Sequence, residues 1–470
     1  MAVHIEYPRA GHRETAGMAN DTFATYQDAI DWLFSATDYE KMRRVRYNAD
    51  TFDLARMTAL LRRLGPPHEG RRFIHIAGTK GKGSTATMVN EVLRAAGHRV
   101  GLYTSPHVTD MRERVRLNGE MISEDTLRDV IGRVRSAVEA VAAEPNRTAP
   151  TYFEILTAVA LVYFRDTNAD AAVLEVGLGG RLDATNVVTP LACGITSISI
   201  DHVAQLGHTL EEIAGEKAGI IKPGVPVVSA PQSAEALAVV ERVAADRGAP
   251  LWIVGREIEI ADFDHEAAGN GVGSRVTIRT PLRQYDDIRL AAAGRHQAVN
   301  AAVAVGLLER AAERGLDWPP RALRDGLAAA RPRARVEVLG RRPTVVNDGA
   351  HNPASMHALV EVLTDAVPHE RLILVFASSA DHDYAANLAC ILPLADHVIL
   401  TTSSSPKSAA PADLAAALGA TRPLPVELIP DASAAADRAL ALAGPDDLLC
   451  FTGSFYLAGL IHAWWRTRHP

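Results

Sequence analysis

The chain has few cysteines and few aromatic residues. Three of its 470 residues are cysteine, and Phe, Trp and Tyr together make up 5%. Cys193, Cys390 and Cys450 lie far apart in apolar surroundings, with no CxxC pair or His-rich tract beside them. This scarcity excludes a disulfide scaffold and a cysteine-rich metal site. It predicts reduced cysteines buried in the core of a cytoplasmic protein.

Long apolar runs and an excess of basic charge are also lacking. No uninterrupted apolar run approaches transmembrane length, and the first residues, MAVHIEYPRAGHRE, contain no apolar signal core. The formal net charge is −7. We therefore expect neither a membrane partner nor a nucleic-acid partner. Any anionic ligand must be bound by cationic side chains gathered at its site.

Apolar residues are plentiful, and short β-branched runs alternate with helical patterns through the first two thirds of the chain. Hydrophobic residues make up 47% of the sequence, enough for packed cores. Strand–helix alternation of this kind is typical of an α/β fold with a parallel sheet covered by helices. The expected strands are residues 73–77, 100–104, 171–176, 193–198 and 226–230.

A second alternating series begins near Val336, with expected strands at 344–348, 372–376, 397–402 and 448–453. It predicts a smaller, Rossmann-like α/β domain at the C-terminal end. Pro332 and its flanking arginines suit a connector, because proline interrupts a helix and arginine resists burial. The predicted organisation is a poorly ordered extension over 1–20, an ATP-binding domain over 21–332, and the second domain over 333–470.

A Gly-rich turn follows the first expected strand. Residues 78–85 read GTKGKGST and precede a helical pattern. The glycines let backbone N–H groups close around phosphate oxygens, the Lys82 ammonium can reach the β- and γ-phosphates, and a Ser84 or Thr85 hydroxyl can hold Mg²⁺. Gly83 separates Lys82 from Ser84, which differs from the commonest GxxxxGK[ST] form. The turn predicts a nucleotide-binding loop made of Gly78, Thr79, Lys80, Gly81, Lys82, Gly83, Ser84 and Thr85.

Segments with polar, ionisable or glycine residues that could bind a ligand follow the other expected strands. TSPH, EVGLGG and the Asp201-His202 pair begin where three of these strands end. Ligands of parallel sheets bind outside the carboxyl ends of the strands, so these segments and the phosphate loop should meet at one edge. Taken singly, Glu175, His202 and Lys217 would be ordinary structural or solvated residues.

Six segments together carry a resemblance to a known family. They are HIAGTKGKGST, YTSPHVTDMRERVRLNGEMIS, EVGLGGRLDATNVV, SIDHVAQLGHTLEEIAGEKAGIIK, GRHQAVNA and NDGAHNP. In this order they resemble the folylpolyglutamate synthase/dihydrofolate synthase family of Mur-type peptide ligases, from about Tyr26 to about Tyr456. The resemblance implies a cytoplasmic, monomeric ligase whose substrates are a reduced folate, L-glutamate and ATP. It also implies an acyl-phosphate intermediate and no enzyme nucleophile.

The resemblance assigns metal ligands residue by residue. Ser84, Ser105 and Glu175 match the site of a first Mg²⁺, and His202 and Lys217 match a second metal site in which family members carry a carbamylated lysine. An ammonium cannot ligate a cation, so Lys217 must lose its proton and take up CO₂. Lys82, Glu175, His202 and Lys217 are therefore the expected catalytic residues.

The resemblance also places residues of the second domain near the nucleotide. Asp348 and His351 match residues at the ribose and phosphates, Arg335 matches a connector arginine that reaches the phosphates, and Asn300 matches a residue near the adenine. ATP is then expected between the domains, with the loop Ser105–Asn118 bordering the folate pocket.

The chain departs from the family pattern in several places, and two of them involve expected site residues. Pro332-Arg333-Ala334-Arg335 stands where many members have Trp-Pro-Gly-Arg, and Lys80 stands where many bacterial members have Asn. Three alternatives stay open at this point. They are a bifunctional enzyme that also joins dihydropteroate to glutamate, a muramyl ligase, and a nucleotide-regulated binding protein.

Overall fold

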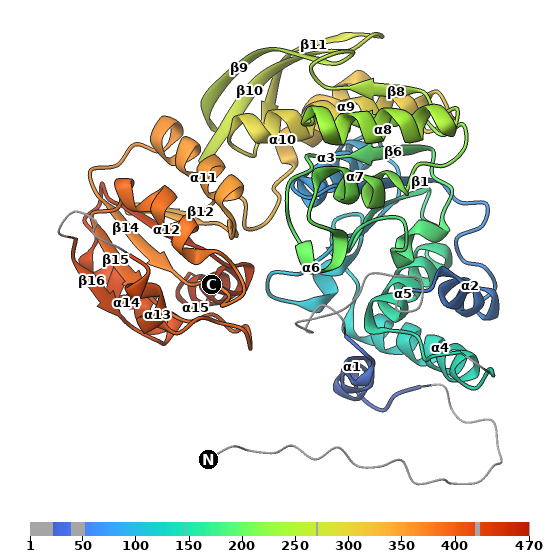
Figure 1. Ribbon diagram of the computed structural model, residues 1–470, viewed down its shortest axis with the longest axis horizontal. Coiled ribbons are helices and arrows are strands. Elements are labelled where there is room, and N and C mark those ends of the chain that lie inside the picture. Colours follow the sequence, from blue (N-terminus) through green and yellow to red (C-terminus); the bar gives the residue numbers. More distant parts are fainter. Residues whose placement is uncertain (1–21, 39–51, 146, 269–270, 419–423, 470) are drawn as a thin grey trace.

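The computed structural model describes residues 22–38, 52–145, 147–268, 271–418 and 424–469 of the chain. The expected extension over 1–20 lies outside these residues. Figure 1 shows two lobes, one from α1 to α10 and a smaller one from β12 to α15. The predicted boundary at 332/333 falls in the stretch between α10 and β12.

An eight-stranded sheet forms the centre of the first lobe, in the order β4-β3-β2-β5-β1-β6-β7-β8. Strands β2, β5, β1, β6, β7 and β8 are parallel to one another. At the β2 side, β3 and then β4 continue the sheet as antiparallel strands. The predicted parallel, helix-covered sheet is confirmed. The strands are β1 (Phe73–Ala77), β2 (Val100–Tyr103), β3 (Val115–Leu117), β4 (Glu120–Met121), β5 (Ala171–Glu175), β6 (Ala192–Ile195), β7 (Val227–Ser229) and β8 (Leu251–Ile253).

Helices cover both faces of this sheet because β1 and β5 are buried on both sides and need apolar partners on each. One face packs on α3 (Lys82–Ala95), α9 (Arg295–Ala312) and α10 (Pro320–Ala329). The other face packs on two groups of helices. These are α1 (Tyr26–Ser35), α2 (Leu54–Arg63), α4 (Glu124–Ala142) and α5 (Tyr152–Asp166), then α7 (Leu210–Ala218) and α8 (Ala234–Asp246), with the short α6 (Val203–Leu206) before α7.

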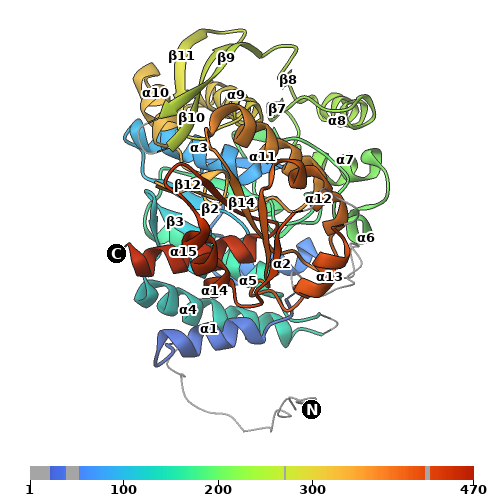
Figure 2. The same ribbon diagram turned by 90° about the vertical axis from the view of Figure 1, so that its left-hand side faces the viewer.

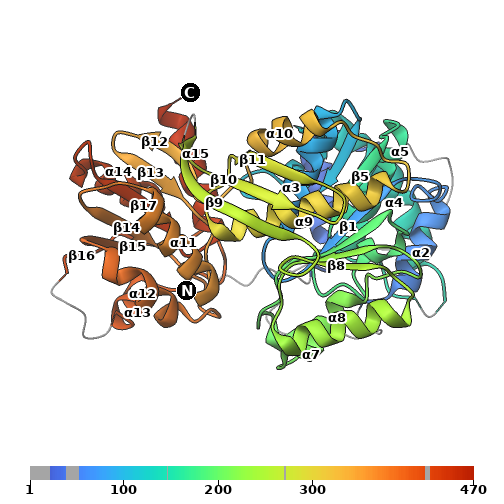
Figure 3. The ribbon, with the colours of Figure 1, turned by 90° about the horizontal axis from the view of Figure 1, so that it is seen from above.

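A three-stranded antiparallel sheet, absent from the sequence-based expectation, lies above α9 and reaches toward the second lobe (Figure 3). Its strands are β9 (Glu259–Ala268), β10 (Gly271–Arg279) and β11 (Gln284–Leu290). Along β11 only Tyr285, Ile288 and Leu290 are buried. Charged residues fill the solvent face of this sheet, so its strands lack the continuous apolar runs by which the parallel strands were recognised.

The second lobe is built on a six-stranded sheet in the order β12-β13-β17-β14-β15-β16, in which only β12 is antiparallel. Figure 2 faces this lobe. One face packs on α11 (Pro353–Ala366), α12 (Tyr384–Ile391) and α13 (Pro411–Ala416), the other on α14 (Ala432–Leu442) and α15 (Phe455–Arg468). The strands are β12 (Glu337–Arg341), β13 (Thr344–Asn347), β14 (Leu372–Phe376), β15 (His397–Leu400), β16 (Val426–Leu428) and β17 (Leu448–Thr452).

The three cysteines are free, and two of them are buried in the cores as expected. The expectation is wrong for Cys390, which packs against the core but is only half-buried, because the buried positions of α12 are Asn387, Leu388 and Ile391. Among the described residues, no helix combines the length and the apolar character needed to cross a membrane.

Candidate functional site

The carboxyl ends of β1, β2 and β5 open onto one cleft of about 600 Å³ between the lobes. The phosphate loop follows β1, Ser105 follows β2, and Glu175 ends β5, so the parallel sheet brings three separate segments to one edge. The cleft is lined by Gly83, Ser84, Thr87, Leu102, Thr104, Ser105, Pro106, Val108, Glu113, Arg116, Glu175, Arg331, Pro332, Arg333, Arg335 and Phe455.

Two glycines are required by the geometry of the phosphate loop. Gly78 and Gly81 have φ of 147° and 92°, values that side chains other than glycine rarely adopt. A Cβ on Gly78 would lie 1.9 Å from the Thr196 Oγ1, and one on Gly81 would lie 2.2 Å from the Asn300 Oδ1. The loop can therefore pack this tightly only without side chains at these positions.

Lys82 is the first residue of α3 and folds back over the loop. Its Nζ donates hydrogen bonds to the carbonyls of Gly78 at 3.1 Å and Thr79 at 3.4 Å. The next two hydroxyl residues are buried, and neither the Ser84 Oγ nor the Thr85 Oγ1 has a hydrogen-bond partner among the residues that the structure describes. Buried polar atoms without partners are uncommon, and here they sit at the positive end of a helix. The loop is thus prepared for a phosphate and a cation.

Glu175 lies beside this loop and is only 4% exposed. Its Oε2 accepts a hydrogen bond from the Ser105 N–H at 3.0 Å, and Gly83 leaves room for the carboxylate against the loop. Burial raises the pKa of Glu175, while Lys82 and the Ser105 N–H oppose that rise. Oxygen atoms of Ser84, Ser105 and Glu175 line the same cleft, and such hard donors fit Mg²⁺.

Lys217 and His202 lie near Lys82, close enough for their charges to interact. Lys217 is 3% exposed, and burial together with the Lys82 charge lowers its pKa to about 7. His202 is exposed in a left-handed conformation at the start of α6, with φ of 51°. Desolvation nevertheless lowers the pKa of His202, partly offset by Asp201. Near neutral pH a substantial fraction of Lys217 therefore carries an uncharged amine, and the lowered pKa of His202 favours its uncharged ring.

No group of three or more His, Cys, Asp and Glu side chains among the described residues is arranged to hold a metal ion. A metal bound here would draw on serine hydroxyls, phosphate oxygens and a modified Lys217 as well as on Glu175 and His202. The unpartnered Ser84 hydroxyl and the buried, readily deprotonated Lys217 fit that requirement.

The second lobe contributes Asp348 after β13, next to the connector residue Arg335. The Asp348 carboxylate accepts hydrogen bonds from the N–H groups of Val336 and Ala350, both at 2.7 Å. Burial raises the pKa of Asp348 and lowers that of Arg335, and the attraction between the two opposes both shifts. The Arg335 guanidinium lies over the Phe455 ring at 4.4 Å and lines the cleft.

His351 joins the two lobes through Lys80. The Lys80 Nζ donates to the Asp201 Oδ2 at 2.8 Å and lies 3.2 Å from the His351 Nε2. The His351 Nδ1 is 2.7 Å from the Gly349 carbonyl, so this nitrogen carries the proton and the Nε2 is free to accept from Lys80. Burial and the Lys80 charge lower the pKa of His351 to about 3, which keeps its ring neutral.

Asn300, on α9, packs against Gly81 and donates to the Gln297 Oε1 at 3.0 Å. The structure thus brings the expected site residues around one junction between the lobes. Sequence reasoning did not single out Glu113, Arg116 and Arg333, which also line the cleft. The repeated charged residues in ERVRLNG and in the connector are the sequence feature that could have identified these three residues.

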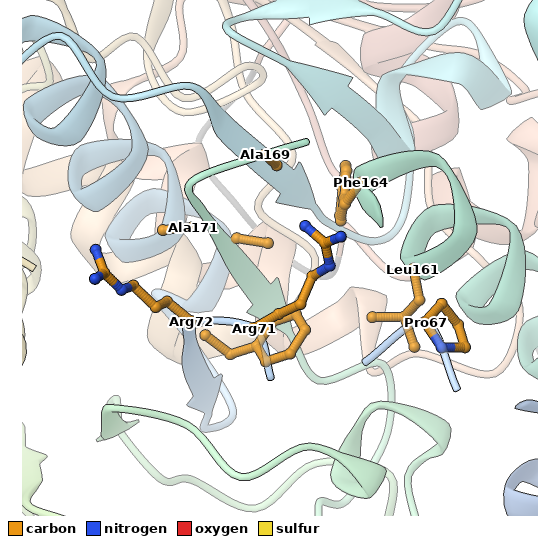
Figure 4. A pocket seen from close by; sticks show the side chains of 9 residues that line it. Pro67, Arg71, Arg72, Leu161, Phe164, Ala169 and Ala171 are labelled. Carbon is orange, nitrogen blue, oxygen red and sulfur yellow. The ribbon is translucent and has the colours of Figure 1, made fainter. Parts of the chain in front are cut away.

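A second recess, too narrow to hold a water molecule, lies at the amino ends of β1 and β5, away from the phosphate loop (Figure 4). Its walls are mainly apolar and include Phe73, Leu161 and Phe164. None of the expected site residues lines it, so we assign it no part in the chemistry.

Two domain families match this chain. The Mur ligase middle domain matches residues 76–308, and the glutamate ligase domain of Mur ligases matches residues 334–455. Together with the phosphate loop and the cleft between two α/β lobes, these matches define a ligase of the Mur type.

Comparison with individual relatives identifies the family within the Mur ligases. Dihydrofolate synthase/folylpolyglutamate synthase of Bacillus subtilis (strain 168) is 36% identical over 83% of this chain and 88% of that protein. The structure of Mycobacterium tuberculosis folylpolyglutamate synthase complexed with ADP and AMPPCP aligns with a TM-score of 0.83 and 32% identity, over 94% of this chain and 99% of that chain. The chain belongs to the folylpolyglutamate synthase/dihydrofolate synthase family, which confirms the resemblance.

A third relative is much longer. The probable bifunctional folylpolyglutamate synthase/dihydropteroate synthase of Haloferax volcanii is 36% identical over 94% of this chain but only 50% of its own length. This chain therefore spans half the length of that relative.

Proposed function

We propose that this chain is an ATP- and Mg²⁺-dependent ligase that adds L-glutamate to the γ-carboxylate of tetrahydrofolate and its polyglutamates. The observation that carries the proposal is the meeting of Lys82, the unpartnered Ser84 hydroxyl and Glu175 at one cleft. The names of the relatives support folate as the acceptor. We also propose a cytoplasmic monomer with domains over 21–332 and 333–470.

In the first step, an oxygen of the folate γ-carboxylate attacks the γ-phosphorus of ATP. The bond from that phosphorus to the bridging oxygen breaks, ADP leaves with the electron pair, and an acyl phosphate forms. Lys82 and the remaining backbone N–H groups of the loop would hold the phosphates and balance their charge, since those of Thr79, Lys80 and Thr85 already donate to backbone carbonyls. Such a transfer depends on positioning and charge stabilisation, so it needs no enzyme nucleophile.

In the second step, the uncharged amine of L-glutamate attacks the acyl carbon. The bond from that carbon to the phosphate oxygen breaks, inorganic phosphate leaves, and the nitrogen loses a proton to solvent as the amide forms. Arg335, Asp348 and His351 from the connector and second lobe, with Asn300 from α9, would hold the nucleotide between the lobes. Closure would keep water from the acyl phosphate.

Ser84, Ser105 and Glu175 would hold one Mg²⁺, which supplies charge neutralisation of the transferred phosphoryl group. For a second site, we propose His202 and a carbamylated Lys217. The uncharged Lys217 amine adds to CO₂ and releases a proton, which yields an anionic carbamate. The burial of Lys217 and its pKa of about 7 support this modification, because they make the uncharged amine available.

A bifunctional enzyme that also joins dihydropteroate to L-glutamate is the second candidate. The Bacillus subtilis relative, which carries both activities in its name, favours it. Both activities would share the same ATP and metal residues.

The test measures phosphate release by the purified chain with ATP, Mg²⁺ and L-glutamate, using tetrahydrofolate or dihydropteroate as acceptor. Release that requires both glutamate and tetrahydrofolate is the expected result. Release with dihydropteroate as well would establish the bifunctional enzyme. Release that continues without glutamate would contradict ligation and indicate a nucleotide-regulated protein, whereas no release with either acceptor would reject both folate activities.

A further inference from the structure

Three arginines of the cleft have no part in the reaction described above. Arg116 comes from β3, and Arg331 and Arg333 come from the connector between α10 and β12. Although they are distant in sequence, they line the same cleft as Ser84 and Glu175. The cleft therefore carries more positive charge than the phosphate loop alone supplies.

Glu113, a carboxylate that lines the same cleft, is already engaged in several hydrogen bonds. It accepts hydrogen bonds from the N–H groups of Val108, Thr109 and Asp110, at 2.9, 3.0 and 3.1 Å, and from the Thr109 hydroxyl. It is only 3% exposed. Glu113 thus anchors the loop at 108–113 and pairs with Arg333, so its single charge offsets only part of the positive charge of the three arginines.

Arg333 is held in place while part of its guanidinium stays unused. Its Nη1 donates to the Glu113 Oε1 at 2.9 Å, whereas its Nη2 is buried and has no hydrogen-bond partner. Arg116 donates through Nε to the Glu113 carbonyl at 3.1 Å, and desolvation together with the charge of Arg333 lowers its pKa. Arg331 is exposed at the cleft. Fixed guanidinium groups with free donors match carboxylates, which they bind through paired hydrogen bonds.

The acceptor itself carries suitable anions. When its terminal γ-carboxylate reaches the phosphate loop, the α-carboxylates of the γ-linked glutamate residues behind it remain charged. A cleft that continues from Ser84 and Glu175 to three arginines can neutralise them.

We propose that Arg116, Arg331 and Arg333 form a carboxylate-binding subsite for the γ-glutamyl tail of the acceptor. This inference rests on the proposed function. In this proposal the three arginines bind the negatively charged γ-glutamyl tail. The phosphate loop and the metal-binding residues carry out the phosphoryl transfer and amide formation.

Direct binding tests the subsite without any turnover. The full chain is titrated calorimetrically with γ-linked triglutamate and, for comparison, with the same trimer in which carboxamides replace all carboxylates (γ-linked tri-isoglutamine amide). Arg333→Gln should weaken triglutamate binding about tenfold, the effect of losing one charge-assisted hydrogen-bonded pair. Arg331→Gln should weaken it about threefold. The matched control is Arg321→Gln, an exposed arginine at the opposite end of α10, and it should change nothing.

Kinetics then identify the source of the carboxylates. The subsite predicts that Arg331→Gln and Arg333→Gln raise KM for triglutamyl tetrahydrofolate more than KM for the monoglutamate, with KM for L-glutamate unchanged. A rise confined to KM for L-glutamate would overturn the proposal and assign the arginines to the incoming amino acid. Equal triglutamate binding by the parent and all variants would also overturn it.

Two further points keep the test decisive. If Arg333→Gln disturbs the loop held by Glu113, its unfolding temperature will show this, and Arg331→Gln, which changes an exposed side chain, then carries the test alone. If the parent chain shows no glutamate-dependent phosphate release, the proposed function fails, and triglutamate binding still reports on the subsite separately.

Discussion

The two lobes contribute to the site in different ways. The first lobe holds its residues on the ends of buried parallel strands and on α3, where Gly78 and Gly81 permit tight packing and Ser84 is left without a partner. The second lobe and the connector meet it through charged and polar pairs, such as His351 with Lys80 and Arg333 with Glu113. In the proposed function, the first lobe therefore presents a pre-formed phosphate site, whereas the contacts across the junction are polar pairs that ligand groups can replace.

This difference suggests that the first lobe carries the residues for the chemical steps, whereas the pairs at the junction serve closure of the two lobes. Contacts built into a packed sheet hold reacting groups within a narrow range of positions. Ion pairs that are partly open to water are weaker and can be replaced by ligand groups. Substitutions in the first lobe should hence reduce kcat, and those at the junction should mainly change KM.

Lys82→Ala should have the largest effect. Removing the cation from the phosphate loop should lower kcat by about a thousandfold, as expected when a positioned group that stabilises transition-state charge is lost. Lys82 is only half-buried, so the unfolding temperature should stay close to that of the parent. Retained ATP turnover, measured as phosphate release, would mean that the loop has another role.

Lys217→Ala should come next, with a loss of about a hundredfold or more in kcat if a metal ligand disappears. Added short-chain carboxylates should restore part of the activity because they can take the place of the carbamate. Full activity without rescue would contradict carbamylation. A mass increase of intact parent protein equal to CO₂ would support it.

Lys80→Asn tests the junction. We expect KM for ATP to rise about fivefold with little change in kcat, in line with the loss of a partly exposed ion pair. A double-mutant cycle with His351→Gln should show coupling, since the two side chains are 3.2 Å apart. A fall in kcat as large as that of Lys82→Ala would remove the distinction between the lobes.

The last prediction concerns the dependence of stability on pH rather than turnover. Burial lowers the pKa of His75, in the core of the first lobe, to about 3 from 6.5. The unfolded chain then binds the extra proton, so this stability is full above pH 6.5 and is lost as the pH falls toward 3. At pH 5.5 the free energy of unfolding should drop by about 1.4 kcal/mol for this group.

The control for that loss is His75→Gln, followed by denaturant unfolding at pH 7 and 5.5. The variant should lose about 1.4 kcal/mol less than the parent over this interval. An identical loss in both proteins would show that His75 does not titrate as its burial indicates.

The parallel sheets could be predicted from sequence because their strands are buried on both faces and form continuous apolar runs, as in FIHIA before the phosphate loop. The antiparallel strands β9–β11 could not, because charged residues on their outer face interrupt that pattern. Within the site, Lys82 and Ser84 follow from local spacing alone. Arg333 and Glu113 are 220 positions apart, so only the folded structure reveals that they meet.

The most direct test of the account follows the oxygen of the acceptor. Tetrahydrofolate labelled with heavy oxygen in its γ-carboxylate is incubated with the purified chain, ATP, Mg²⁺ and L-glutamate, and the released phosphate is analysed by mass spectrometry. An acyl-phosphate mechanism predicts that one labelled oxygen from the carboxylate appears in each phosphate as the amide forms. Unlabelled phosphate, released while the folate keeps both labelled oxygens, would contradict the account.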